Sequence, residues 1–323
     1  MNVCIVGFGA IGPIHARALK ETNCANLYAI CDVIKSRADD GVKKYGGKAI
    51  YSFEEVLADK NIDAVHICTP HYMHYPMIVK ALDAGKKVVS EKPIVMTKEE
   101  WDKLLAHPKI DQLCPVLQNR HNACIKEFKK LVDSGKFGKI LGVKGMLTWR
   151  RTADYYNSEE WRGTWDKEGG GVMINQAVHT LDYFSYLGGK VKSVNAMMAN
   201  YTLKGVIEVE DTMAIHMQYD DGVVGVFFAT NGFSTGSNPM FEITFEKGII
   251  RYEDAKLFVN GEFVTEDSVG KGEKWYWGTS HETVVNDFYT ENKHFSLQEI
   301  KPTMDLLFAC YKSAKTNQEI TLD

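Results

Sequence analysis

The chain has no apolar run long enough to cross a bilayer and no excess of basic charge. Its 323 residues include 38 Lys and Arg against 42 Asp and Glu, a formal net charge of −4. A membrane-spanning helix needs about 20 mostly apolar residues, and nucleic-acid binding normally shows as a basic face. We therefore expect no membrane partner and no nucleic-acid partner, which leaves small molecules as the expected ligands.

Cysteines are few, scattered and odd in number. None of the seven forms a Cys-x-x-Cys pair, and several fall inside expected strands. Such spacing gives no disulfide framework, so we expect reduced and mostly buried thiols. Because residue 2 already begins an expected strand, there is no room for a cleaved secretion signal. The sequence predicts a cytoplasmic protein.

Residues 1–120 are expected to form a doubly wound α/β domain of the Rossmann type. Short apolar runs alternate there with helical patterns, which is typical of a parallel sheet with helical crossovers. A chain of 323 residues also exceeds one comfortable hydrophobic core, so a second domain should follow. The expected strands of the first domain are Asn2–Val6, Leu27–Cys31, Ala64–Cys68, Lys87–Ser90 and Cys114–Gln118.

Residues 121–323 are expected to form an α+β domain with a large, mostly antiparallel open sheet. Apolar and polar residues alternate over 212–219, and Asp220-Asp221-Gly222 then turns into a strand over 223–230. A helix over 171–187 should cover one sheet face, and a helix near 298–314 could pack back on the first domain. Open sheet faces of this size commonly form subunit interfaces, so we expect a homodimer or homotetramer.

A glycine-rich turn, Gly7-x-Gly9-x-x-Gly12, follows the first expected strand and opens a helix. Glycines at this spacing permit a tight turn, close approach of a pyrophosphate and close packing of strand and helix. Asp32 ends the second strand, where a carboxylate binds the ribose of NAD. Arg37 lies just beyond and could reach a 2′-phosphate, so NADP stays an alternative to the favoured NAD. The expected cofactor contacts here are Gly7, Gly9, Ala10, Ile11, Gly12, Asp32 and Arg37.

Glu91-Lys92-Pro93 comes directly after the expected strand over 87–90. Proline fixes its own φ and favours an extended residue before it, so Lys92 projects in a set direction. Open α/β sheets bind ligands at the carboxyl ends of their strands. Lys92 is therefore expected to face a ligand cleft rather than the core.

The segment 66–74 holds four potential metal ligands in nine residues. His66 and Cys68 share one side of a buried strand, whereas Pro70 ends that strand before His71 and His74. No acidic ligand is near in the sequence, so we expect no metal. The segment instead lies at a carboxyl strand end and can line the nicotinamide half of the cofactor. The expected contacts are Thr69, Pro70, His71 and His74.

A second chemical segment runs from Gly169 to Asp182. On a helix, Asn175, His179 and Asp182 fall at i, i+4 and i+7 and form one polar stripe on an apolar segment. The glycine triplet at 169–171 leaves the N–H groups of the helix start accessible to substrate or cofactor oxygens. The pattern favours a functional His179 over a merely structural one.

These motifs resemble those of the Gfo/Idh/MocA oxidoreductases, over essentially the whole chain. The resemblance rests on the glycine turn, Glu91-Lys92-Pro93, Gln118-Asn119-Arg120 and the segment 169–182. It implies NAD(P)-dependent hydride transfer to or from a secondary alcohol of a sugar, sugar derivative or cyclitol. It also implies that Lys92 and His179 are catalytic. The further expected cofactor contacts are Glu91, Lys92, Gln118, Trp161 and Arg162, and the expected substrate contacts are Lys92, Arg120, Trp149, Arg162, Trp165, Asn175 and His179.

The chain departs from inositol-dehydrogenase-like members at Asn175, where they carry an aspartate. An amide cannot relay a proton or raise the basicity of an imidazole as a carboxylate would. Either His179 acts alone or Lys92 is the main proton carrier, and Asp182 is expected to be structural. The resemblance leaves two other functions open: a glycosidase that oxidises its substrate transiently with bound NAD, and a non-catalytic regulator that responds to a dinucleotide.

Overall fold

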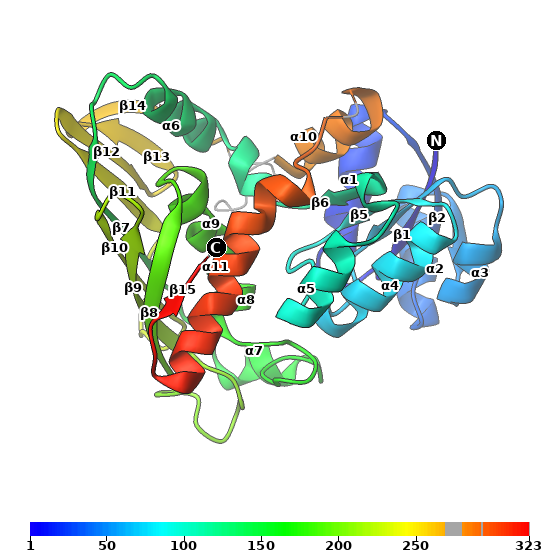
Figure 1. Ribbon diagram of the computed structural model, residues 1–323. Helices are drawn as coiled ribbons and strands as arrows, with labels where there is room; N and C mark the ends of the chain where they lie inside the picture. Colours follow the sequence, from blue (N-terminus) through cyan, green and yellow to red (C-terminus); the bar gives the residue numbers. More distant parts are fainter. Residues whose placement is uncertain (269–279, 292, 323) are drawn as a thin grey trace. The chain divides into compact units, whose positions relative to one another are not determined.

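The computed structural model describes residues 1–268, 280–291 and 293–322 and divides into two compact units (Figure 1). The first unit contains Met1–Gln118 together with the described residues of 279–299. The second contains the described residues of 119–278 and those from Ile300 onward. The chain therefore leaves the first unit at Gln118 and returns to it before the C-terminal helix.

A six-stranded parallel sheet, in the order β3-β2-β1-β4-β5-β6, forms the centre of the first unit. The expected Rossmann-type domain is confirmed. Three residues of β1, Val3, Cys4 and Ile5, are fully buried, as in parallel sheets covered on both faces. The strands are β1 (Asn2–Val6), β2 (Asn26–Cys31), β3 (Lys48–Ile50), β4 (Ala64–Ile67), β5 (Lys87–Ser90) and β6 (Leu113–Pro115).

The helices of the first unit follow the strands along the chain, except for α10, which returns from much later in the sequence. Helix α10 packs against α1, and its Val285 joins the same hydrophobic cluster as Ala18 and Leu19. These helices are α1 (Gly12–Thr22), α2 (Lys35–Tyr45), α3 (Phe53–Ala58), α4 (His71–Asp83), α5 (Lys98–Leu105) and α10 (Ser280–Asn286).

A nine-stranded sheet, in the order β14-β13-β12-β11-β7-β10-β9-β8-β15, forms the second unit. The expected α+β domain with a mostly antiparallel sheet is confirmed, and β7 and β10 are a parallel pair inside it. The strands are β7 (Ile140–Thr148), β8 (Val191–Ala199), β9 (Thr212–Tyr219), β10 (Val224–Thr230), β11 (Met240–Phe245), β12 (Gly248–Glu253), β13 (Lys256–Val259), β14 (Glu262–Glu266) and β15 (Ile320–Thr321).

One face of this sheet is covered by helices, and the other, here called the outer face, is not. Phe184 of α9 packs against Phe227 and Phe241, with ring centroids 5.3 and 5.1 Å apart, and these rings form the core of the unit. The helices are α6 (Ala123–Asp133), α7 (Ala153–Asn157), α8 (Val172–Asn175), α9 (Val178–Tyr186) and α11 (Leu297–Thr316). Exposed apolar side chains on the outer face include Leu141, Met146, Met197, Val224, Val226, Ile249 and Phe263.

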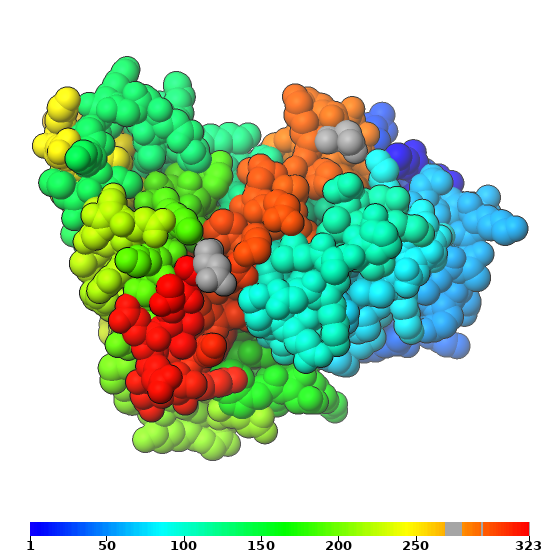
Figure 2. Space-filling view, viewed as in Figure 1, coloured from blue at the N-terminus to red at the C-terminus, as the bar shows by residue number. Residues whose placement is uncertain are grey.

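The C-terminal helix α11 belongs to the second unit from Ile300 onward. Lys315 and Thr316 at its end are exposed, and the C-terminal residues, coloured red, lie at the surface in Figure 2. Among the described residues, no helix combines the length and the apolar composition that a membrane crossing requires.

Candidate active site

The glycine turn between β1 and α1 is confined by neighbouring backbone. Gly7 has a φ of +89°, and a Cβ there would lie 2.7 Å from the carbonyl oxygen of Cys68. A Cβ at Gly12 would lie 2.6 Å from the carbonyl oxygen of Gly7. Both contacts are too short for any side chain, so the turn needs glycine at these positions. The absence of side chains at these glycines thus lets a phosphate approach the backbone closely at the start of α1.

Asp32 ties this turn to the end of β2. One carboxylate oxygen accepts the N–H of Phe8 at 2.7 Å, and the other accepts the N–H of Ile34 at 2.8 Å. Each oxygen keeps a further lone pair for a ribose hydroxyl. Arg37 stands on the first turn of α2 with its Nη1 3.9 Å from where a Cβ on Gly9 would lie. The turn, the carboxylate and the guanidinium expected from the sequence are therefore brought together.

Lys92 lies two residues beyond the end of β5, and its peptide bond to Pro93 is cis. His74 of α4 braces this corner, because its Nδ1 lies 2.7 Å from the carbonyl oxygen of Pro93 and its Nε2 lies 2.8 Å from that of Thr69. Burial lowers the pKa of His74. A neutral imidazole has one N–H, so His74 donates to one of these two carbonyl oxygens while its ring packs between the Thr69–Pro70 loop and the Lys92–Pro93 corner. His71, at the first turn of α4, is also buried.

Glu91 is buried beneath the same corner and accepts hydrogen bonds from two histidines. His15 Nε2 lies 3.0 Å and His281 Nε2 3.2 Å from Glu91 Oε1, while the backbone N–H of Lys92 donates to Oε2 at 3.2 Å. Burial alone would raise the pKa of Glu91, but the hydrogen bonds from His15 and His281 outweigh it and hold that pKa well below its usual value. The carboxylate therefore stays ionised.

The hydrogen bonds continue from His15 to His66 and Tyr289, and they determine each tautomer. His15 Nδ1 lies 2.9 Å from His66 Nδ1, and His66 Nε2 lies 2.9 Å from the Tyr289 hydroxyl. Burial lowers the pKa of both His15 and His66, so both rings are neutral. His15 donates from Nε2 to the carboxylate, so its Nδ1 must accept from His66. His66 Nε2 then accepts the hydroxyl proton of Tyr289.

His15, Glu91 and His281 could also hold a metal, since their ligand atoms all lie within 4.8 Å of one another. These residues come from α1, the end of β5 and α10, so no short sequence motif joins them. The histidine-rich segment at 66–74 contributes none of the three. Both histidines form hydrogen bonds to Glu91, and these hydrogen bonds account for the short distances between the three side chains.

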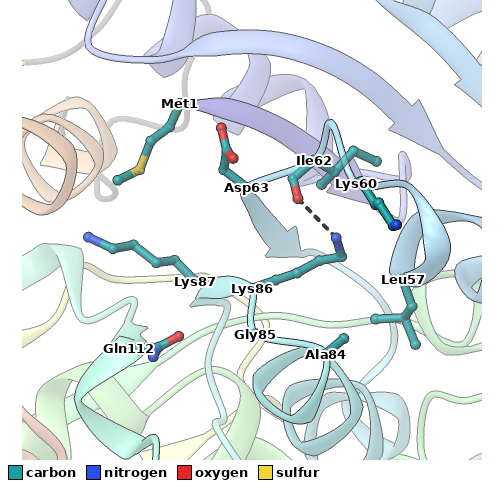
Figure 3. Close-up of a pocket in the computed structure, with 10 residues that line it drawn as sticks. All are labelled: Met1, Leu57, Lys60, Ile62, Asp63, Ala84, Gly85, Lys86, Lys87 and Gln112. Atoms are coloured by element: carbon teal, nitrogen blue, oxygen red, sulfur yellow. Dashed lines mark hydrogen bonds between the residues drawn. The ribbon is translucent and has the colours of Figure 1, made fainter.

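A surface hollow lies at the opposite, amino-terminal edge of the first sheet (Figure 3). Met1, Asp63 and Gln112 line it just before β1, β4 and β6 begin. The buried Lys86 donates to the carbonyl oxygens of Asp59 and Ile62 at 3.0 and 2.9 Å, so its ammonium holds a loop in place. The hollow is therefore separate from the glycine turn and from Lys92.

In the second unit, the helix expected over 171–187 is broken. Helix α8 ends at Asn175, and α9 begins at Val178. The side chain of Gln176 is held in the gap between them, where its Oε1 accepts a hydrogen bond from Asn231 Nδ2 at 2.9 Å. The expectation of one continuous helix is therefore wrong, and the spacing between Asn175 and His179 crosses the break. His179 lies on the first turn of α9 and is largely buried.

The N–H groups at the start of α8 are occupied, so the expectation that they are accessible to a ligand is wrong. Glu210 accepts from the N–H groups of Gly171 and Met173 at 2.8 and 3.1 Å, and its backbone carbonyl accepts from that of Val172. A Cβ at Gly171 would lie 1.8 Å from that carbonyl oxygen. The glycines thus permit close packing of Glu210 instead of opening the helix to a ligand.

Arg120 and Asp182 form a buried ion pair. Arg120 Nε and Nη2 donate to the carboxylate at 2.8 and 2.6 Å, and the Thr303 hydroxyl donates to the same carboxylate at 2.5 Å. Two parallel hydrogen bonds of this kind fix the guanidinium plane. Asp182 thus joins α9 to η2 (Gln118–His121) and to α11, which is a structural arrangement. Gln118, the last residue of the first unit, is also buried.

The loop 161–165 is held by Arg162 and Trp165. Arg162 Nη1 donates to the carbonyl oxygen of Tyr155 and to Ser158 Oγ at 2.9 and 2.6 Å, and Trp165 Nε1 donates to the carbonyl oxygen of Glu208 at 3.1 Å. Trp149 and Trp161 are each half-buried. Aromatic faces and fixed donors of this kind suit the recognition of a sugar ring.

Glu168 is a charged residue of this region that the motifs did not single out. Its side chain is fully buried and accepts hydrogen bonds from Asn175 Nδ2 and from the N–H of Gly163. Burial raises the pKa of Glu168 to about 7, against the lowering effect of these two hydrogen bonds. The feature of the sequence that could have pointed to Glu168 is its position directly before the glycine triplet at 169–171.

Comparison with known proteins assigns a family to each half of the chain. Residues 1–115 match a model described as "Oxidoreductase family, NAD-binding Rossmann fold", and residues 125–251 match the "GFO/IDH/MocA C-terminal domain". The description of the first model names NAD, which is the cofactor that the sequence favours over NADP.

Similar proteins include myo-inositol 2-dehydrogenase of Thermotoga maritima, 26% identical over 259 residues, with 77% of this chain and 74% of that protein covered. Another is scyllo-inositol 2-dehydrogenase (NAD(+)) of Bacillus subtilis, 28% identical over 260 residues, with 77% and 73% covered. Among solved structures, the WlbA dehydrogenase from Bordetella pertussis in complex with NADH and UDP-GlcNAcA has a TM-score of 0.87 and 28% identity, covering 100% of this chain and 99% of that one.

Replacement of His15 by alanine should destabilise the protein. The change removes a donor from the buried Glu91 carboxylate and an acceptor from His66. Loss of a neutral donor from a buried charged group typically costs about 2 kcal/mol. Urea unfolding measures the difference, and Lys103→Ala, which breaks only an exposed pair with Glu99, is the matched control. Equal unfolding midpoints for the two variants would contradict the network's importance.

Proposed function

The chain belongs to the Gfo/Idh/MocA family of NAD-binding oxidoreductases, and we propose that it transfers a hydride between NAD and a secondary alcohol of a sugar, sugar derivative or cyclitol. The observation that carries the proposal is the Glu91-Lys92-Pro93 corner. There a buried ionised carboxylate and the His74 brace hold Lys92 at the carboxyl edge of a sheet that carries the glycine turn.

The residues of the first unit fit a dinucleotide. At Gly7 and Gly12, neighbouring backbone occupies the space that a Cβ would fill, so the turn is tight. A tight glycine turn of this kind lets a pyrophosphate approach the backbone closely. Asp32 would accept the ribose hydroxyls through its remaining lone pairs. The loop at Thr69–Pro70 would line the nicotinamide half. When bound, NAD supplies the acceptor for the hydride.

Lys92 and His179 would perform the proton chemistry. His179 takes the proton of the substrate hydroxyl as the hydride departs, and the ammonium of Lys92 stabilises the negative charge that develops on the alcohol oxygen. The electrostatic effect of an ammonium is larger where water is excluded than in bulk solvent. In the reverse direction, the same residues would polarise the carbonyl and return the proton.

The substrate class is supported by the relatives and by the second unit. The similar proteins described above are named as inositol dehydrogenases, and the WlbA structure contains UDP-GlcNAcA. Trp149, Trp161 and Trp165 could stack on the faces of a sugar ring, and Arg162 could donate to its hydroxyls. Cyclitols, sugars and nucleotide sugars are therefore the compounds to screen.

The wild-type protein should form NADH from NAD with at least one member of such a panel, as read by absorbance at the nicotinamide band. Lys92→Met should then lower kcat by about 100-fold or more, the range for loss of a positioned acid, base or charge. NAD affinity should change little. Lys43→Met, an exposed lysine on α2, is the control. Wild-type turnover in Lys92→Met would refute the role of Lys92, and hydrolysis without net NADH would identify a glycosidase instead.

We also propose a cytoplasmic homo-oligomer that buries the outer face of the nine-stranded sheet. Val226 and Met146, on the adjacent central strands β10 and β7, are both exposed there. Such an apolar surface on a sheet is a common subunit interface. The seven free cysteines suit a reducing compartment.

Light scattering after size-exclusion chromatography should give a multiple of the 36.4 kDa chain mass. Val226→Glu, which places a charge at the centre of the outer face, should shift the protein towards monomer. Lys130→Glu on α6 also adds an acidic residue but lies away from this face, so it should leave the mass unchanged. A monomeric wild type would rule out the interface.

A further inference from the structure

Two arginines stack on one tyrosine in the second unit. The guanidinium carbon of Arg162 lies 4.3 Å from the centroid of the Tyr155 ring, and that of Arg151 lies 5.1 Å from the same centroid. Arg151 also lies 5.0 Å from the ring of Trp149, and Arg162 lies 5.5 Å from the ring of Trp161. These two cations and three aromatic rings are here called the arginine cluster.

Each guanidinium group is held through one of its amino groups. Nη1 of Arg162 donates to the carbonyl oxygen of Tyr155 at 2.9 Å and to Ser158 Oγ at 2.6 Å. Nη1 of Arg151 donates to the carbonyl oxygen of Arg150 at 2.9 Å. Nη2 of each arginine forms no hydrogen bond with any described residue and, unlike Nε, is not enclosed. Both groups are therefore fixed in direction and keep one amino group for a ligand.

The positive charge of the cluster is not neutralised within the part of the chain that the structure describes. No acidic side chain there forms an ion pair with either arginine, and Arg162 only favours the ionised form of Glu168 from a distance. Because both guanidinium groups approach the same ring, they lie closer than the Debye length of about 10 Å at 0.1 M salt and repel each other. A ligand with negative charge would relieve this repulsion.

Tyr155 joins the cluster to the segment that holds the proposed base. Its hydroxyl accepts a hydrogen bond from Gln176 Nε2 at 3.3 Å. Gln176 lies in the gap between α8 and α9, where Asn231 fixes its side chain, and His179 lies on the first turn of α9. The ring that carries both arginines is therefore one hydrogen bond away from this gap.

We propose that Arg151 and Arg162 bind a negatively charged group of the substrate, a carboxylate or a phosphate. This inference rests on the proposed function and narrows its substrate class to sugars that carry such a group, in place of neutral cyclitols. The planar guanidinium matches the oxygens of either group, and hydrogen bonds between ionised partners are stronger than those between neutral ones. The stacked rings also keep water from the faces of the guanidinium groups, which strengthens their attraction for an anion.

Binding without turnover is the first test. Calorimetric titrations of the full chain are made in the presence of NADH, which cannot accept a hydride. Glucuronate tests the carboxylate, glucose 6-phosphate and UDP-glucose test the phosphate, and glucose and myo-inositol are the neutral references. At least one charged compound should bind about tenfold or more tightly than glucose, and added salt should reduce the difference. Equal affinities for glucose and all three charged compounds would overturn the inference.

Variants then show whether the arginines cause the preference. Arg151→Gln removes one charge and should weaken binding of the preferred charged compound about tenfold or more, with unchanged affinities for glucose and NADH. Arg162→Lys keeps the charge without the planar fork and should retain part of the preference. Arg150→Gln removes the exposed neighbouring arginine and is the matched control, which should bind as the wild type does.

Urea unfolding checks that each variant is folded, and Arg162→Lys serves as the test if Arg151→Gln is not. An unchanged preference in both folded cluster variants, or an equal loss in Arg150→Gln, would overturn the inference. Weaker NADH binding in Arg151→Gln would also overturn it, because the arginines would then bind the cofactor.

Turnover with NAD separates this inference from the proposed function. The preferred charged compound should form NADH, and Arg151→Gln should lower kcat/KM for it mainly through a higher KM. A charge preference that depends on Arg151, with no NADH from any compound, would refute the proposed function and leave the anion site supported. Oxidation of neutral compounds without any preference for charged ones would overturn the anion site and leave the proposed function supported.

Discussion

The cost of burying a carboxylate governs both halves of this protein. A carboxylate removed from water must be surrounded by donors, because otherwise it takes up a proton or destabilises the fold. Glu91 in the first unit and Glu210 in the second meet this requirement with donors from segments far apart in sequence. Each carboxylate therefore holds distant segments together: Lys92 follows Glu91 directly, and α8, whose start is bound by Glu210, precedes the helix α9 that carries His179.

Three buried glutamates show how the donor set determines the charge. Glu91 receives two imidazole N–H groups and one backbone N–H, and its pKa is lowered despite burial. Burial raises the pKa of Glu168 and of Glu210, although each also accepts hydrogen bonds. Glu91 is accordingly ionised at neutral pH, whereas Glu168, with a pKa of about 7, is divided between its two protonation states there. The first arrangement gives a rigid corner and the second a group that responds to its surroundings.

Patterns of neighbouring residues were sufficient to predict the parts of the fold that depend on short-range interactions. Short apolar runs alternating with helical patterns, together with the glycine turn, identified the Rossmann-type unit, although the three-residue β3 was too short to recognise. The errors came from long-range contacts. Nothing near Gly171 in the sequence indicates that Glu210 occupies the helix start, and nothing near Glu91 indicates His281. The break after Asn175 is likewise associated with Asn231, which binds Gln176 in the gap.

The late position of His281 and Tyr311 in the chain has a consequence for biosynthesis. His281 completes the donors around Glu91 in the first unit, and the Tyr311 hydroxyl donates to Glu210 at 2.8 Å in the second. Domains generally fold as units during synthesis, starting from the N-terminus. Here neither unit can reach its final hydrogen bonding until the ribosome has made α10 and most of α11. Both buried carboxylates should therefore stay short of donors until late in translation.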